Sequence, residues 1–139
     1  MIDHNLMIHR FFRAVDAREW DTVGGCFADQ VRLDYTSLFD GEPETLTPEE
    51  ILGRWQGLLP GFEATMHFLG PLVEDGDTVE CNVRGYHHLE GQTWMVAGWY
   101  TLTVIERDER PLIAGITLAS SYEEGSRDLV ARAQENAAR

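Results

Sequence analysis

An acidic residue stands where a predicted helix calls for a hydrophobic one. Apolar residues recur from Ile8 to Val15 at the spacing of one face of an amphipathic helix, and Asp16 occupies the next position on that face. If the face extends that far, the carboxylate lies at the edge of the core, where an isolated charge is costly and needs a partner. If the face ends at Val15, Asp16 is solvated or caps the next segment. The spacing leaves both alternatives open.

The histidine that could partner this acid lies in a second apolar run. The segment "TMHFLG", residues 65 to 70, predicts a strand in which Thr65, His67 and Leu69 share one face. A core histidine satisfied by hydrogen bonds is the default interpretation. A neighbouring carboxylate would orient the imidazole and raise its affinity for a proton, and such a pair can act as a general base in a pocket. Sequence spacing does not bring Asp16 and His67 together.

The remaining candidates for chemistry give weaker signals. His87 and His88 are adjacent in a predicted strand, so only one of them can face a cavity. A metal site made from one of them and His67 is conceivable, but no spacing typical of metal ligands occurs, and we predict no metal site. Cys26 and Cys81 lie far apart without a CxxC pattern, which is typical of reduced, buried thiols.

The elements that must position these residues begin with helices. The patterns predict two helices and then a strand, over residues 4 to 18, 19 to 27 and 31 to 35. The next helix, within residues 46 to 59, has a well-defined start. Thr47 is its predicted N-cap, Pro48 its first residue, and Glu50 completes a capping box.

Strand patterns take over after residue 62. Four long candidates span residues 62–74, 78–90, 92–106 and 111–122. The last three are joined by short turn signals, so we expect an antiparallel meander. The tail, residues 124–139, could form a final helix or fray. Helices followed by a curved antiparallel sheet predict a single α+β domain over residues 1–139, with a pocket between helices and sheet.

Composition and charge limit the partners. With 24 acidic against 11 basic residues the formal net charge is −13, so the surface should repel nucleic acid and anionic membranes. A small ligand or another protein subunit fits better. The first residues lack the basic start and apolar run of a signal peptide, and no later run approaches a membrane span. We therefore predict a cytoplasmic protein.

Four segments along the chain carry a family resemblance. They read "AREWDTVGGCFADQVRLDYTSLFD", "TPEEILGRWQGLLPG", "TMHFLG" and "VRGYHHL". Together they resemble scytalone dehydratase and the wider polyketide-cyclase-like (SnoaL-like) group of the ketosteroid isomerase and nuclear transport factor superfamily, over residues 8 to 120. The pairing of "LDYTSLFD" with "TMHFLG" is typical of the dehydratase-like branch. The resemblance implies a cone-shaped α+β barrel, in which a curved antiparallel or mixed sheet wraps around N-terminal helices and encloses an apolar cavity.

The resemblance also implies roles for particular residues. In the dehydratase, a histidine paired with an aspartate removes a proton next to a ketone and helps to expel a hydroxyl, without any cofactor. Asp16 and His67 match those positions, and Tyr35 matches a tyrosine that hydrogen-bonds to the substrate carbonyl through water. The residues expected to line the substrate cavity are Phe12, Val15, Leu38, Arg54, Trp55, His87, Tyr100, Ile116 and Leu118.

The sequence departs from the dehydratase in the groups that grip the substrate. Val15 replaces a second tyrosine, Gly98 and Tyr100 stand for a serine and an asparagine, and a second histidine has no clear counterpart. The base is retained while much of the binding shell differs. The resemblance therefore implies the type of chemistry rather than scytalone as the substrate.

The sequence supports two classes of function. The first is a cofactor-independent lyase that dehydrates a hydrophobic, polycyclic or aromatic ketone, with isomerisation or cyclisation as alternatives because they need the same proton abstraction. The second is a non-catalytic binding module, which a solvent-exposed Asp16 or an outward-facing His67 would favour. Edge strands and several tryptophans predict a homodimer or homotrimer, which is compatible with either class.

Overall fold

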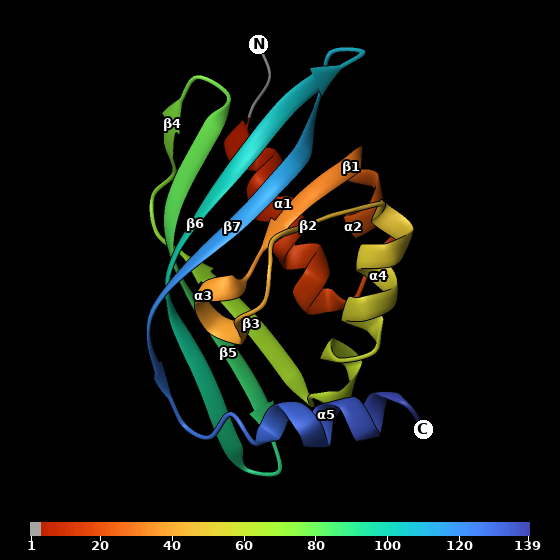
Figure 1. Ribbon diagram of the computed structural model, residues 1–139, viewed down its shortest axis with the longest axis vertical. Helices are drawn as coiled ribbons and strands as arrows, with labels where there is room; N and C mark the ends of the chain where they lie inside the picture. Colours follow the sequence, from red (N-terminus) through yellow and green to blue (C-terminus); the bar gives the residue numbers. More distant parts are fainter. Residues whose placement is uncertain (1–3) are drawn as a thin grey trace.

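The computed structural model describes residues 4–139, in which helices pack against one curved sheet (Figure 1). The elements in chain order are α1 (His4–Ala17), α2 (Trp20–Gly25), β1 (Phe27–Asp34), α3 (Thr36–Phe39), β2 (Glu44–Leu46), α4 (Pro48–Gln56), the 3₁₀ helix η1 (Leu59–Gly61), β3 (Ala64–Leu69), β4 (Val73–Asp75), β5 (Thr78–Leu89), β6 (Gln92–Arg107), β7 (Arg110–Glu124) and α5 (Leu129–Ala137). The predicted α+β class is confirmed.

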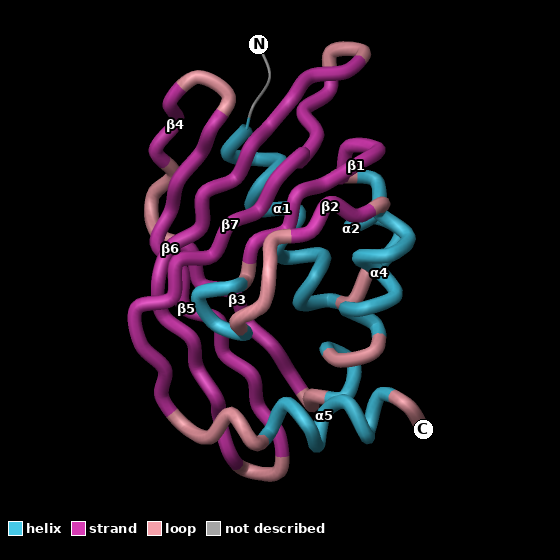
Figure 2. The backbone as a smooth tube through the Cα atoms, in the orientation of Figure 1, coloured by secondary structure: helices cyan, strands magenta, loops and turns pink. Residues whose placement is uncertain are grey.

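The sheet has seven strands and mixed direction. Its order is β2-β1-β7-β6-β5-β3, with β4 paired to the far end of β5. The antiparallel meander expected from the sequence is formed by β5, β6 and β7, whereas β1 joins β7 in parallel. Register shifts between β6 and β7 are typical of bulges, which bend strands. The sheet curves around α1 but does not close, so the predicted barrel is an open cone (Figure 2).

Two predicted boundaries differ from the structure. The candidate strand at residues 62–74 is divided into β3 and β4, because Gly70 and Pro71 interrupt it and proline has no backbone N–H for a ladder. The strand predicted from residue 31 already begins at Phe27. The short helix before it ends at Gly25 because glycine is a poor helix former.

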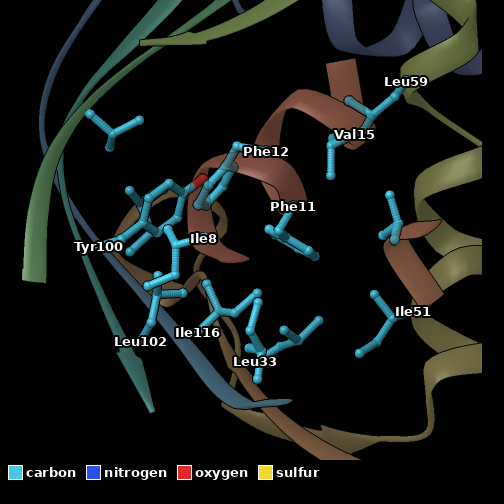
Figure 3. Close-up of a cluster of buried hydrophobic side chains, with 14 of the residues drawn as sticks. Ile8, Phe11, Phe12, Val15, Leu33, Ile51, Leu59, Tyr100, Leu102 and Ile116 are labelled. Carbon is cyan, nitrogen blue, oxygen red and sulfur yellow. The ribbon is translucent and has the colours of Figure 1, made fainter. Parts of the chain in front are cut away.

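The core lies between α1 and the concave face of the sheet. Ile8 and Phe11 are fully buried, and the rings of Phe11 and Phe12 meet edge to face with centroids 5.0 Å apart. Figure 3 shows these side chains facing residues of β1, β6 and β7, including Leu33 and Leu102. The helical stripe read from the sequence is therefore the face that α1 buries.

Specific hydrogen bonds stabilise the helices α4 and α5. The capping box of α4 is present, with Thr47 accepting from the Glu50 N–H and Glu50 accepting from the Thr47 N–H. The C-terminal tail forms α5 and packs on η1, where the Asn136 side chain donates to the Gly61 carbonyl. Of the two alternatives for the tail, the structure has the helix.

Within residues 4–139, no helix is both long and apolar enough to cross a bilayer.

Candidate active site

The last turn of α1 carries Asp16 onto the strand β3. Its Oδ1 lies 2.8 Å from His67 Nδ1 and accepts from the Thr65 hydroxyl at 2.9 Å, and its Oδ2 accepts from the His67 backbone N–H at 2.7 Å. The side chains are mostly buried, with 19% of Asp16 and 11% of His67 exposed. The helical face thus extends to Asp16, and the carboxylate has the partner that its position demands.

The electrostatics of this pair determine the tautomer of the histidine. Burial by itself raises the pKa of Asp16, but the hydrogen bonds from His67 and Thr65 and the charge of His67 outweigh it and lower the pKa. The carboxylate is therefore ionised at neutral pH and can only accept hydrogen bonds. In the neutral imidazole the proton is therefore on Nδ1, which faces Asp16 Oδ1, and the lone pair is on Nε2.

A second imidazole, that of His87 on β5, lies beside His67. The two ring centroids are 6.3 Å apart, and Gly85, which faces His67 across the strand pair, lies between the rings without a side chain. The His87 ring packs against the Trp94 ring with centroids 4.6 Å apart, and His87 Nδ1 lies 3.2 Å from the Trp94 carbonyl oxygen. Burial, with a smaller effect of the His67 charge, lowers the pKa of His87 to about 4. His87 is therefore neutral at physiological pH, whereas His88 faces the opposite side of the sheet.

Tyr35 follows β1 and belongs to the same cavity. Asp34 accepts from the backbone N–H and hydroxyl of Thr36 at 3.1 and 2.7 Å, which begins α3 and turns the chain at Tyr35. Burial raises the pKa of Tyr35 to about 12, although a hydrogen bond with Tyr100 lowers it. The phenol keeps its proton and can donate it. Tyr100 in turn stacks on Phe12 with ring centroids 5.0 Å apart (Figure 3).

A cavity of about 610 Å³ opens beside these groups. Its wall is largely apolar, and both His67 and Tyr35 belong to it. The residues expected at the cavity that the structure does find in its wall are Phe12, Val15, Leu38, Arg54, Trp55, His87, Tyr100 and Leu118. Ile116 was wrongly expected there. It is 1% exposed and packs in the core beside Leu33 and Leu102, because β7 reaches the cavity only one inward position later, at Leu118.

Other cavity residues were missed by the sequence reasoning. They come from the strands β1, β5 and β6, from loops and short elements, and from the C-terminal helix: Leu33, Thr36, Phe39, Asp40, Glu42, Glu44, Leu58, Leu59, Val83, Gly85, Trp94, Val96, Val130 and Gln134. Strand alternation could have indicated Val83 and Gly85, which share a face with His87. No sequence signal distinguishes the loop residues. Thr65, which bonds Asp16, was visible only as a neighbour of His67 on its face.

The described residues offer neither a cluster of metal ligands nor a reactive cysteine. Among the residues that the structure describes, no group of three or more His, Cys, Asp or Glu side chains is placed to hold a metal ion. Both cysteines are free, Cys26 half-buried and Cys81 buried. Burial raises the pKa of the Cys81 thiol to about 11, and it also raises that of Cys26 despite the opposing charge of Arg110. Neither is an activated nucleophile.

Comparison with known proteins identifies the family. The sequence profile of the SnoaL-like domain matches residues 6–115, which is most of the chain. The chain belongs to the SnoaL-like family. The match includes Asp16, Tyr35 and His67 and the cavity-lining residues from Phe12 to Tyr100. Among curated proteins, no relative matches the sequence.

Solved structures share the SnoaL-like fold at low identity. The Kfla4162 protein from Kribbella flavida is 21% identical with a TM-score of 0.80, and the match covers 91% of this chain and 92% of that one. A candidate scytalone dehydratase from Novosphingobium aromaticivorans is 15% identical, with a TM-score of 0.77 and coverage of 88% and 85%. Hexachlorocyclohexane dehydrochlorinase LinA-type3 from Novosphingobium barchaimii is 17% identical, with a TM-score of 0.71 and coverage of 87% and 86%. At these identities the similarity concerns the fold.

Proposed function

We propose that this SnoaL-like protein is an enzyme that removes a proton from the carbon next to the carbonyl of a hydrophobic, ring-containing ketone, and that this step leads to loss of water. The observation that carries the proposal is the Asp16–His67 pair at the wall of an apolar cavity. A pure binding protein gains nothing from a buried carboxylate that orients an imidazole, whereas a general base needs that arrangement.

The proposed reaction uses His67 and Tyr35 of the cavity wall and Asp16, which is hydrogen-bonded to His67. His67 Nε2 takes the proton from carbon, and the Asp16 carboxylate stabilises the imidazolium that forms. The Tyr35 hydroxyl donates to the enolate oxygen, directly or through water, where negative charge develops. The imidazolium then returns its proton to the hydroxyl on the adjacent carbon, which leaves as water as the double bond forms. The base is regenerated, and no external oxidant or reductant is needed.

Two finer alternatives remain within the proposal. Isomerisation and intramolecular cyclisation begin with the same proton abstraction and differ in where the enolate is next protonated or which carbon it attacks. The names of two structural neighbours favour an elimination over these alternatives, since one is a candidate dehydratase and the other a dehydrochlorinase. The cytoplasmic location and the homodimer or homotrimer stay predictions of the sequence.

The test separates proton abstraction from the later loss of water. A bicyclic β-hydroxy ketone, whose dehydration gives a naphthol, is incubated with the protein in heavy water. NMR measures deuterium uptake next to the carbonyl, and absorbance measures naphthol formation. We expect exchange with the wild type and its loss by about 100-fold or more in His67→Gln. Exchange without naphthol would support proton abstraction, the step that isomerisation and cyclisation share, and would contradict dehydration of this ketone. Binding without exchange favours the binding module instead.

A further inference from the structure

The formally charged side chains of the cavity wall are all exposed, so they lie where the cavity meets solvent. They are Asp40, Glu42, Glu44 and Arg54. Arg54 is the one Lys or Arg among the described residues that line the cavity. An anionic ligand would therefore depend on this guanidinium for a counter-charge.

Arg54 is already engaged by Glu44. Its Nη1 and Nη2 donate to the two carboxylate oxygens of Glu44 at 2.7 and 2.8 Å, which is the bidentate geometry of strong Arg–carboxylate pairs. The pairing lowers the pKa of Glu44 and raises that of Arg54, so both groups stay ionised and cancel one another. The remaining charges of the rim are negative. They are those of Glu42 and Asp40, and Asp40 interacts electrostatically with Arg127.

We propose that the Arg54–Glu44 pair is a specificity determinant, which makes the cavity select uncharged ligands and reject carboxylates and phosphates. A ligand anion would have to compete with Glu44 for Arg54 while approaching the carboxylate of Glu42. A neutral ketone meets neither penalty. The inference rests on the proposed function in that it takes the cavity to be the ligand site, and it adds the charge class of the ligand.

The size of the effect is limited by solvent. The side chains of Arg54 and Glu44 are 55% and 47% exposed, so water and salt screen their charges. Pairs of this kind change affinities by factors of about 1.5 to five rather than by orders of magnitude. The effect should also shrink as the salt concentration rises.

The test compares two probes that differ in charge and little else. Methyl naphthyl ketone and naphthoate, substituted at the same ring position, are titrated into the protein by calorimetry at neutral pH. The readout is the ratio of the naphthoate affinity to the ketone affinity, which cancels losses common to both probes. In the wild type we expect this ratio to be well below one.

Variants of the pair should move the ratio in opposite directions. Glu44→Gln frees the guanidinium and should raise the ratio about 1.5- to fivefold, with the gain falling in high salt. Arg54→Gln leaves Glu44 uncompensated and should lower it, and the double variant should lose the gain of Glu44→Gln. Asp108→Asn, which removes one charge in the turn between β6 and β7, is the matched control and should leave the ratio unchanged.

The outcomes distinguish this inference from the proposal beneath it. Equal affinity of the wild type for both probes, or an unchanged ratio in Glu44→Gln, overturns the charge selection and leaves the ketone site intact. Failure of the ketone probe to bind the wild type overturns both, because the cavity would then not be a site for such ligands. Thermal melting would show whether Glu44→Gln is folded. If it is not, Arg54→Gln tests the charge selection: a lower ratio supports it, and an unchanged or higher ratio overturns it.

Discussion

The Asp16 carboxylate accepts hydrogen bonds from a ring, a hydroxyl and a backbone N–H, and all three donors belong to Thr65 or His67. An acid held this way has no freedom to rotate, so the imidazole that it orients is also fixed. Removal of one partner would cost stability, since the buried charge would then be uncompensated. For catalysis it means that the base is in place before a ligand enters.

Asp16→Asn should disable the base while keeping its shape. Both carboxylate oxygens of Asp16 accept hydrogen bonds, whereas an amide offers one acceptor oxygen and one donor NH2 group. The ring therefore loses its preference for carrying the proton on Nδ1. We expect deuterium exchange of the hydroxy-ketone to fall about 100-fold, with ketone affinity changing far less. Thr65→Val removes one donor but leaves the ring bond, and should cost less than about tenfold. Equal losses in both variants would contradict an orienting role for Asp16.

His87 should leave a signature in the pH dependence of stability. Its folded pKa is about 4, below the ordinary value of 6.5, so the unfolded chain binds a proton more readily than the folded one between these values. Stability is therefore complete above pH 6.5 and declines as the pH falls toward 4. In His87→Gln, the free energy of unfolding should fall by about 2 kcal/mol less than in the wild type between neutral pH and about pH 5. Urea unfolding measures this difference. His88→Gln, on the other face, should retain the slope.

The sequence allowed some of these residues to be placed and not others. Alternation predicts that His87 and His88 face opposite ways, and the structure agrees. The contact of Asp16 with His67 spans 51 positions, and no local pattern carries such a contact; the family resemblance supplied it. The Arg54–Glu44 pair lay hidden because Glu44 belongs to a strand of three residues, too short for a periodic signal.

Among the elements, α5 decides whether the cavity has an end wall. It contributes Val130 and Gln134 to the lining and rests on η1 with almost no space between the backbones. A Cβ on Gly61 would lie 1.7 Å from the Ala133 carbonyl oxygen, a distance that no rotamer change can relieve. Glycine at this position is therefore what allows the C-terminal helix to dock.

Gly61→Ala should lift α5 from the cone. We expect a loss of about 2 kcal/mol or more in the free energy of unfolding, since backbone must move to admit the methyl group. Ketone affinity should fall as well, because the wall formed by Val130 and Gln134 is displaced. Gly53→Ala is the matched control: nothing lies within 4 Å of the added Cβ, and the change sits inside α4. It should stabilise the protein by up to about 1 kcal/mol. Unaltered ketone binding in Gly61→Ala would separate α5 from the ligand site.

Elements with local signals were predictable, and those that depend on distant pairing were not. The capping box marked the start of α4 from Thr47, Pro48 and Glu50, and the turns marked the β5–β6–β7 meander. The parallel pairing of β1 with β7 joins segments far apart in the sequence, and only the closed hydrogen-bond ladder reveals it. α3 is too short for helical periodicity and depends on the Asp34 side chain and its tie to β7 through Ser37.

Across the whole molecule, the convex face of the sheet carries an apolar cluster while the net charge is −13. Met66, Phe68, Trp99 and Tyr122 are between 45% and 65% exposed and come from β3, β6 and β7. Phe68 and Tyr122 lie in one row of paired residues that runs across the strands through Arg84 and Ala97. Exposed apolar patches of this kind are typical of protein interfaces, and a two-fold axis through a sheet face makes it self-complementary.

Self-association through this face should depend on Phe68 and respond to salt in a defined direction. Phe68→Ser combined with Tyr122→Ser should shift the mass in sedimentation equilibrium to that of a monomer. Val73→Ser, which alters a side chain 63% exposed on β4, is the matched control and should leave the mass unchanged. Because the copies repel one another through their net charge of −13, salt should strengthen an association driven by apolar contact. Weakening by salt would instead assign the contact to ion pairs, and a monomeric wild type would leave the cluster without a role in assembly.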